Sequence, residues 1–188
     1  MDTLYNSLSG PFIQTLIFEK SLLMFGVLHK ERTSQSMANS FDYLEDIFGH
    51  DLFRRFFHLV LTDRGSEFEK VDLFEFNTVT GEARLKMFYC DPMASHQKPH
   101  VENNHNFVRD IIPNGVSLDN FTQDDIDLMF SHINSTPRES LDDKTPYEVF
   151  EFLHSNNNSI EILNLLNIEK IEKDKVILKP YLLKKPKK

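Results

Sequence analysis

Three short apolar runs, residues 2–6, 12–18 and 22–29, open the chain, and they constrain its fold more than any other feature. The turn-forming residues 9–11 (Ser-Gly-Pro) and the polar residues 19–21 separate these runs. Apolar runs of this length, with turn signals between them, are typical of β-strands joined by short connections. The sequence therefore predicts a three-stranded antiparallel meander at the N-terminus.

A helical pattern follows the meander. Met37 and Phe41 start an apolar series at helical spacing, and Thr33 or Ser34 precedes it as the N-cap. Gly49 stands where a C-terminal cap belongs. We expect an amphipathic helix between these two ends.

Two further strands and three further helices are predicted downstream. Residues 58–62 are nearly all apolar and are bounded by polar residues, the pattern of a strand covered on both faces, and residues 85–90 are the next strand candidate. Residues 97–112 have apolar side chains on one helical face. Thr122 and Thr145 are each followed by an acid three residues on, which is typical of a helix start.

The order of the elements places the chain in the α/β class. A meander followed by strands that alternate with helices predicts a mixed five-stranded sheet flanked by helices, with a functional crevice at the strand ends. We expect residues 1–155 to form this core. Residues 156–188 are then a C-terminal extension with a short helix over 160–168, a strand over 175–178 and a Lys-rich tail.

Charge and composition exclude several classes of protein. The 188 residues include 29 acidic and 21 basic side chains, a formal net charge of −8, which argues against holding nucleic acid through a broad positive surface. No stretch approaches the roughly 20 consecutive apolar residues of a membrane span, and the N-terminus lacks the pattern of a secretory signal. The single cysteine excludes an internal disulfide and a cysteine-rich zinc site. We therefore expect a cytoplasmic protein without membrane contact.

Three acidic residues are candidates for chemistry. Asp63 follows an apolar strand and precedes a turn, so its carboxylate would point into the crevice; an aspartate that caps the turn explains the pattern equally well. Glu102 shares a polar helix face with Asn106 and Arg109, and a solvated surface is the ordinary explanation of such a face. Asp2 opens the first strand, where a frayed chain end is the ordinary explanation.

Taken together, the three acids have a rationale that none has alone. If the first and fourth strands are neighbours, Asp2 and Asp63 lie about one strand spacing, roughly 4.8 Å, apart, and a helix packed on the sheet adds Glu102. Three carboxylates in a small volume repel each other unless cations neutralise them, and oxygen ligands select Mg²⁺ or Mn²⁺. Two such ions about 3.5–4 Å apart would hold the attacking and leaving oxygens of a phosphoryl displacement.

Several separated motifs carry a resemblance to a known family. They are residues 1–6 (MDTLYN), 10–15 (GPFIQT), 61–68 (LTDRGSEF), 88–93 (FYCDPM), 97–98 (QK), 102–105 (ENNH), 134–138 (NSTPR) and 144–148 (KTPYE). In this order they resemble the catalytic core of bacterial insertion-sequence transposases, and the nearest group is the insertion sequence 30 family. The resemblance covers about residues 1–155.

This resemblance implies a ribonuclease H-like fold with an Asp-Asp-Glu metal triad. Asp2 matches the first-strand aspartate, Asp63 the second aspartate and Glu102 the helix glutamate of that family. The triad is expected to hold two Mg²⁺ or Mn²⁺ ions. The implied activity is metal-dependent DNA cleavage at the element's ends, followed by transfer of the freed 3′-hydroxyl strand into target DNA during transposition.

The resemblance also implies partners. We expect the protein to bind DNA, both the element ends and the target, and to form a homo-oligomer. In related enzymes a basic residue seven positions after the glutamate helps to hold DNA, and Arg109 occupies that place. Lys98 and Asn106 are the other expected DNA contacts.

Three departures from the family pattern keep other functions open. Pro99 and His100 stand where the family usually has glycine ahead of Glu102, the chain begins one residue before Asp2, and the net charge is −8. The alternative function is that of a truncated, catalytically inactive remnant that acts only in DNA or subunit binding. A glycosidase that uses Asp63 and Glu102 as its carboxylate pair is a weaker rival, because the chain has no tryptophan to stack on sugars.

Overall fold

The computed structural model describes residues 1–7, 10–91, 99–155 and 159–183, without the side chains of residues 99–103. The strands are β1 (Asp2–Tyr5), β2 (Phe12–Phe18), β3 (Leu23–His29), β4 (Leu59–Thr62) and β5 (Lys86–Tyr89). The α-helices are α1 (Ser34–Phe48), α2 (His50–Phe57), α3 (Val71–Glu75), α4 (Pro99–Ile111), α5 (Gln123–Asn134), α6 (Pro146–Leu153) and α7 (Ser159–Leu165). The short 3-10 helices are η1 (Ser66–Phe68), η3 (Glu139–Leu141), η5 (Lys173–Lys175) and η6 (Pro180–Leu183).

The predicted α/β class is confirmed. Within the described ranges no helix combines the length and the apolar character needed to cross a membrane.

The antiparallel meander predicted at the N-terminus is confirmed. β1 pairs with β2, with Asp2 opposite Thr15, and β2 pairs with β3 over all seven of its residues. β4 and β5 form a separate parallel pair, in which Leu61 lies opposite Phe88. The strand candidates of the sequence analysis are therefore all strands, apart from the one in the C-terminal extension.

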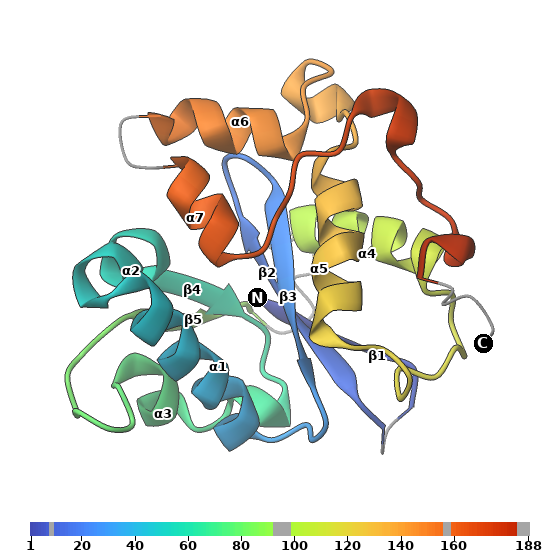
Figure 1. Ribbon diagram of the computed structural model, residues 1–188. Coiled ribbons are helices and arrows are strands. Elements are labelled where there is room, and N and C mark those ends of the chain that lie inside the picture. The colour runs from blue at the N-terminus through green and yellow to red at the C-terminus, as the bar shows by residue number, and fades with distance from the viewer. Residues whose placement is uncertain (8–9, 92–98, 156–158, 184–188) are drawn as a thin grey trace.

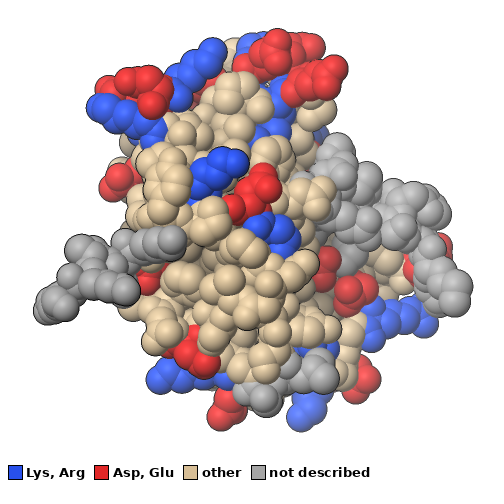
Figure 2. All heavy atoms as spheres, turned by 90° about the vertical axis from the view of Figure 1, so that its right-hand side faces the viewer, with Lys and Arg blue, Asp and Glu red and all other residues tan. Residues whose placement is uncertain are grey.

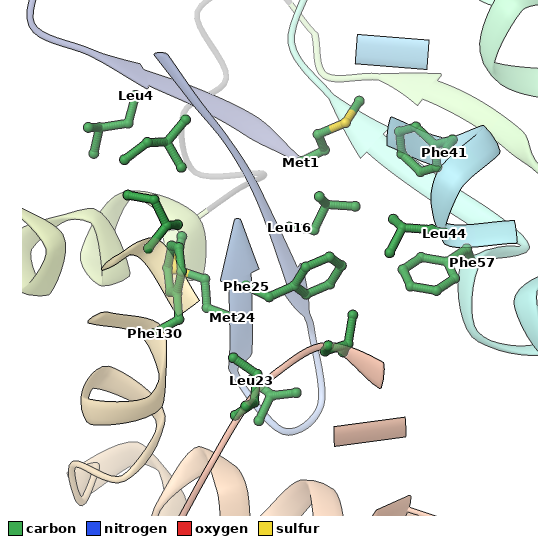
Figure 3. Close-up of a cluster of buried hydrophobic side chains, with 14 of the residues drawn as sticks. Met1, Leu4, Leu16, Leu23, Met24, Phe25, Phe41, Leu44, Phe57 and Phe130 are labelled. Atoms are coloured by element: carbon green, nitrogen blue, oxygen red, sulfur yellow. The ribbon is translucent and has the colours of Figure 1, made fainter. Parts of the chain in front are cut away.

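The three-stranded sheet lies in the middle of the molecule and is covered on both faces (Figure 1). In Figure 3, Leu16 and Phe25 lie on the face of the sheet toward Phe57 of α2, whereas Met24 lies on the other face, next to Phe130 of α5. Successive side chains of a strand point to opposite faces, so a sheet buried on both sides needs apolar residues at consecutive positions. This explains why β2 and β3 are apolar at most consecutive positions, with the buried Gln14 and Thr15 as polar residues within β2.

The helix starts predicted at three threonines are confirmed. The hydroxyl groups of Thr33, Thr122 and Thr145 each accept a hydrogen bond from the backbone N–H three residues on. Thr122 and Thr145 also form complete capping boxes with Asp125 and Glu148. A threonine at this position is a strong local signal. Its side chain accepts from a backbone N–H group that the first helical turn would otherwise leave without a partner.

Helix α2 is an element that the sequence analysis did not predict. Gly49 ends α1 as expected, donating to the carbonyl of Glu45, but the same glycine, at φ 73°, also precedes α2. The positive φ turns the chain sharply between the two helices. As a result Phe53 and Phe57 are buried and stack on each other with ring centroids 4.9 Å apart. Tertiary packing of this kind stabilises a helix that is too short to be stable alone.

In the described residues the five strands pair as two sheets, so the single mixed sheet stays a prediction. Strands β1 to β3 form one sheet and β4 with β5 another, and no ladder joins β1 to β4 in the described residues. One hydrogen bond, from the Met1 amine to the carbonyl oxygen of Leu61, crosses between them at 2.7 Å. Beyond Met1 a groove of about 460 Å³ separates residues 16–19 from residues 56–61. The backbone hydrogen bond between the two sheets is therefore made by Met1, the residue just before β1.

The two-stranded sheet is also less buried than predicted. Val60 and Thr62 of β4 face the core, but Leu59 is 55% exposed, and Phe88 of the neighbouring strand is 52% exposed. The expectation of a strand covered on both faces is therefore wrong for β4. Its apolar sequence reflects one core face and one open face that is also apolar.

The C-terminal extension packs on the core. Ile162 and Leu163 of α7 are fully buried in the same apolar cluster as the central sheet. The strand predicted over residues 175–178 is not formed. The backbone N–H of Ile177 instead donates to Nδ1 of His132 in α5 at 3.1 Å. This segment lies against a helix, which offers no strand edge for pairing.

Gly26 allows α5 to pack directly on β3. A Cβ atom at this position would lie 2.5 Å from Cε2 of Phe130 and 2.8 Å from Cγ2 of Ile13. We predict that Gly26→Ala lowers the free energy of unfolding by about 1–3 kcal/mol, because a buried ring has to move. Urea unfolding measures this change. The control Val79→Ala, at a side chain 87% exposed, should change it by less than about 0.5 kcal/mol. Equal stability of Gly26→Ala and the native chain would contradict this packing.

A buried polar network ties α1 to the central sheet. His29 of β3 makes hydrogen bonds through Nε2 to Oε1 of Gln14 at 2.9 Å and through Nδ1 to the hydroxyl of Ser36 at 2.8 Å. The hydroxyl of Ser40 donates to the same Gln14 oxygen at 2.7 Å. That oxygen can only accept, so His29 donates from Nε2. Burial lowers the pKa of His29 from 6.5 to about 4, so the ring is neutral at pH 7 and its Nδ1 accepts from Ser36.

We predict that His29 makes the fold less stable in acid. An unfolded His29 takes up a proton below about pH 6.5, whereas the folded one does so only near pH 4. Between these values the unfolded state binds more protons, so the free energy of unfolding falls as the pH falls. Urea unfolding between pH 4 and 7 should show a shallower pH dependence for His29→Gln, by up to about 1.4 kcal/mol per pH unit. Equal slopes for the two proteins would show that His29 is not the titrating group.

Candidate functional site

Strand β1 carries Asp2 to the junction between the two sheets. The Asp2 carboxylate is half-buried and accepts a hydrogen bond from the backbone N–H of Thr3 at 2.8 Å. The carbonyl oxygen of Asp2 accepts from the hydroxyl of Thr15, its partner residue in β2, at 3.2 Å. Both the backbone and the side chain of Asp2 are therefore held in place, although it is the second residue of the chain.

Asp63 follows the last residue of β4, on the other side of the junction. Its Oδ1 accepts a hydrogen bond from the backbone N–H of Gly65 at 2.9 Å. The turn-capping interaction considered in the sequence analysis is therefore present, and it also fixes the orientation of the carboxylate. Two residues before Asp63, the carbonyl oxygen of Leu61 accepts from the Met1 amine, so β4 lies beside the strand that carries Asp2.

Helix α4 approaches the same junction through His105. Nε2 of His105 lies 2.9 Å from the hydroxyl oxygen of Thr15. Because Thr15 donates its one hydroxyl proton to the Asp2 carbonyl, His105 must donate from Nε2 to Thr15. Glu102 precedes His105 by three residues, slightly less than one helical turn. The middle of the helix with the third predicted acid therefore contacts β2 at Thr15, the residue paired with Asp2.

The structure brings together the three elements predicted to carry the metal triad, and it leaves the triad itself a prediction. Glu102 lies in α4, as expected, but its side chain is outside the described part of the structure. Among the residues that are described, no group of three His, Cys, Asp or Glu side chains is placed to hold a metal ion. Asp2 and Asp63 thus lie on either side of the junction between the two sheets. The side chain of Glu102, their predicted third partner, is outside the described residues.

The three predicted DNA contacts have different positions. Arg109 donates to the side chain of Asn6 and, at 3.2 Å, to the carbonyl of Tyr5, so it joins α4 to the end of β1. Partial burial lowers the pKa of Arg109. Asn106 is exposed on α4, and Lys98 falls outside the described residues. DNA binding by these side chains stays a prediction, and Arg109 has a structural role that the sequence did not reveal.

Sequence reasoning missed three residues that organise the junction. Thr15 and His105 link β2 to α4, and Glu67 is a buried carboxylate that accepts from the hydroxyl of Thr3 at 2.9 Å. A signal for Glu67 was available, because it belongs to the motif over residues 61–68 that also contains Asp63. Thr15 and His105 likewise end the motifs over residues 10–15 and 102–105, but they lie 90 positions apart and no local pattern predicts their contact.

The surface charge next to α4 and α5 is mixed. On the face shown in Figure 2, Lys and Arg side chains alternate with Asp and Glu, most densely at its upper end and again near the middle, and a largely uncharged area lies below the middle. This face therefore shows no continuous basic band among its described residues, in agreement with the net charge of −8. Non-specific phosphate binding depends on such bands.

Comparison with curated proteins shows that the chain is similar to transposases of insertion sequences. One of them is the transposase InsI of insertion sequence element IS30A from Escherichia coli, which is 35% identical over 89 residues, 47% of this chain and 22% of InsI. The resemblance drawn from the motifs is therefore confirmed. No family model matches the chain.

Two further relatives come from other bacteria. The transposase of element IS4351 from Bacteroides fragilis is 27% identical over 101 residues, 54% of this chain and 29% of the relative. The transposase of element IS1086 from Cupriavidus metallidurans is 28% identical over 75 residues, 40% of this chain and 21% of the relative. The matched region thus spans less than a third of the length of each of these three relatives.

We predict that Thr15 holds α4 against the central sheet. Thr15→Val keeps the shape of the side chain but removes the hydroxyl between Asp2 and His105. The free energy of unfolding should fall by about 1–3 kcal/mol, since buried polar groups lose a partner. Hydrogen exchange in residues 104–109 should become faster in Thr15→Val and stay close to native in Thr15→Ser, which keeps the hydroxyl. Native exchange rates in Thr15→Val would show that this link does not hold the helix.

Proposed function

We propose that this chain contains the catalytic core of a transposase, which cleaves DNA and transfers a DNA strand with the help of divalent metal ions. The observation that carries the proposal is the meeting of β1, β4 and α4 at one junction, through the Met1–Leu61 and Thr15–His105 hydrogen bonds. The similarity to insertion-sequence transposases supports the same function. We further propose that the protein acts in the cytoplasm, on the element's ends and on target DNA, as a homo-oligomer.

We propose a ribonuclease H-like arrangement for the strands. The hydrogen bond from Met1 to Leu61 lies between the two sheets and supports the order β3-β2-β1-β4-β5 across them. The first three strands are antiparallel and the last two are parallel, as the predicted mixed sheet requires. In this arrangement the first strand is central, and both aspartates lie where the two sheets meet.

The proposed metal ligands are Asp2, Asp63 and Glu102. They fit divalent ions by their chemistry, because carboxylates offer hard oxygen donors of the kind that Mg²⁺ and Mn²⁺ prefer. Ions bound there would supply the positive charge that stabilises the attacking and leaving oxygens of a phosphodiester in an in-line displacement. The bonds from Thr3 to Asp2 and from Gly65 to Asp63 orient two of the carboxylates before any ion binds.

The remaining residues of the junction hold helix α4 in a fixed position relative to the strands. Thr15 of β2 and His105 hold the middle of α4 to the central sheet, and Arg109 holds the end of the same helix to Asn6. The helix that carries Glu102 is thus fixed at two points, and we propose that Glu102 reaches the aspartates from it. Such rigid placement matters because a catalytic group displaced by 1 Å can lose about a hundredfold in rate.

We predict that the chain binds Mn²⁺ and that Asp63 is required. Calorimetry and electron paramagnetic resonance should detect binding to the native chain, and Asp63→Asn should bind at least about 10-fold more weakly, since even residues that only support ligands change affinity that much. Mn²⁺-dependent nicking of supercoiled DNA should fall in parallel. Asp72→Asn, at an exposed aspartate on α3, is the matched control and should behave like the native chain.

Two results would contradict the proposal. Equal nicking by the native chain and Asp63→Asn would reject the assigned active site. A native chain that binds no Mn²⁺ would favour the inactive remnant, which folds and binds DNA or subunits but cannot assemble the metal site.

A further inference from the structure

Glu67 is a buried carboxylate beside the proposed site that the triad does not include. It lies in η1, four residues after Asp63, and only 3% of its surface is exposed. Its Oε1 accepts from the hydroxyl of Thr3 at 2.9 Å, and its Oε2 forms an ion pair with Arg32 at 3.2 Å. A buried carboxylate is costly unless it is paired in this way, so its position calls for a reason.

Glu67 and Asp63 occupy the same side of one turn. A Cβ atom at Gly65 would lie 2.8 Å from Oε2 of Glu67 and 3.1 Å from Oδ1 of Asp63. Both carboxylates therefore approach the same point, and the absence of a side chain at Gly65 leaves room for them. The Glu67 side chain therefore lies against the turn that orients Asp63.

Thr3 connects this turn to the strand that carries Asp2. The backbone N–H of Thr3 donates to Oδ1 of Asp2, and the hydroxyl of the same residue donates to Glu67. One residue thus bonds to Asp2 on one side and to the Asp63 turn on the other. No ladder joins β1 to β4 in the described residues, so side-chain contacts have to define the spacing of the two aspartates.

Arg32 adds a second contact between Glu67 and β1. While paired with Glu67, its guanidinium lies 4.6 Å from the centre of the Tyr5 ring. Tyr5 is two residues after Thr3, and residues two apart on a strand share a face. Glu67 therefore holds this face of β1 at two points, directly through Thr3 and indirectly through Arg32 and Tyr5.

We propose that Glu67 is a positioning residue that sets the distance between Asp2 and Asp63 through Thr3 and Arg32. This inference rests on the proposed function, because it assigns Glu67 to the metal site of that function. Glu67 acts through its neighbours and does not itself hold the ions. Groups that support metal ligands in this manner typically contribute 10–100-fold to metal affinity.

The test compares Mn²⁺ affinity in Thr3 variants of the whole chain. Thr3→Val has the same shape but no hydroxyl, and Thr3→Ser keeps the hydroxyl. We expect Thr3→Val to bind Mn²⁺ about 10-fold more weakly and to show an altered Mn²⁺ resonance spectrum, and Thr3→Ser to restore native affinity. The matched control is Thr78→Val, which removes an equivalent bond from a threonine hydroxyl to the carboxylate of Asp42. It should leave the affinity unchanged.

A second variant covers the case in which Thr3→Val does not fold. Arg32→Met removes the ion pair with Glu67 at a side chain that is partly exposed, and it should also weaken Mn²⁺ binding. Native affinity in both folded variants, while Asp63→Asn binds weakly, would overturn the positioning role and leave the proposed function intact. Absence of Mn²⁺ binding in the native chain would overturn both.

Discussion

The hydrogen bond from the Met1 amine to the carbonyl oxygen of Leu61 is the contact on which the candidate site depends, because it joins the two sheets one residue before Asp2 and two residues before Asp63. A single backbone hydrogen bond contributes only about 0.5–1.5 kcal/mol net. It cannot by itself fix the position of one sheet against the other. The side-chain bonds of Thr3 to Glu67 and the packing below the junction must supply the remaining constraint.

Aromatic packing supplies much of this constraint. Phe57 of α2 contacts Phe18 and Phe25 of the central sheet, with ring centroids 5.7 and 6.1 Å apart. Helix α2 leads directly into β4, so the same ring that packs on the sheet of Asp2 anchors the strand of Asp63. The Met1 side chain lies on this face of the sheet too (Figure 3). The phenylalanine-rich core thus has a consequence for function, since it holds the two aspartates in one region.

Elements with strong local signals could be predicted from the sequence, whereas features that depend on distant contacts could not. The capping residues Thr122 and Thr145 predict the starts of two helices, because a capping box is formed by residues only three positions apart. The sequence predicts Gly49 only as the end of a helix, since nothing local reveals that a second helix follows and buries Phe57. The division into two sheets and the role of Glu67 depend on contacts between residues about 60 positions apart, which a pattern of apolar and polar residues does not encode.

The most direct test of the central claim is the location of Mn²⁺ in crystals of the protein, found from its anomalous scattering. The account predicts one or two peaks at the junction of the sheets, within about 2.0–2.6 Å of carboxylate oxygens of Asp2 and Asp63, with Glu102 completing the site. Peaks elsewhere on the protein, or a Glu102 carboxylate directed away from the two aspartates, would contradict it.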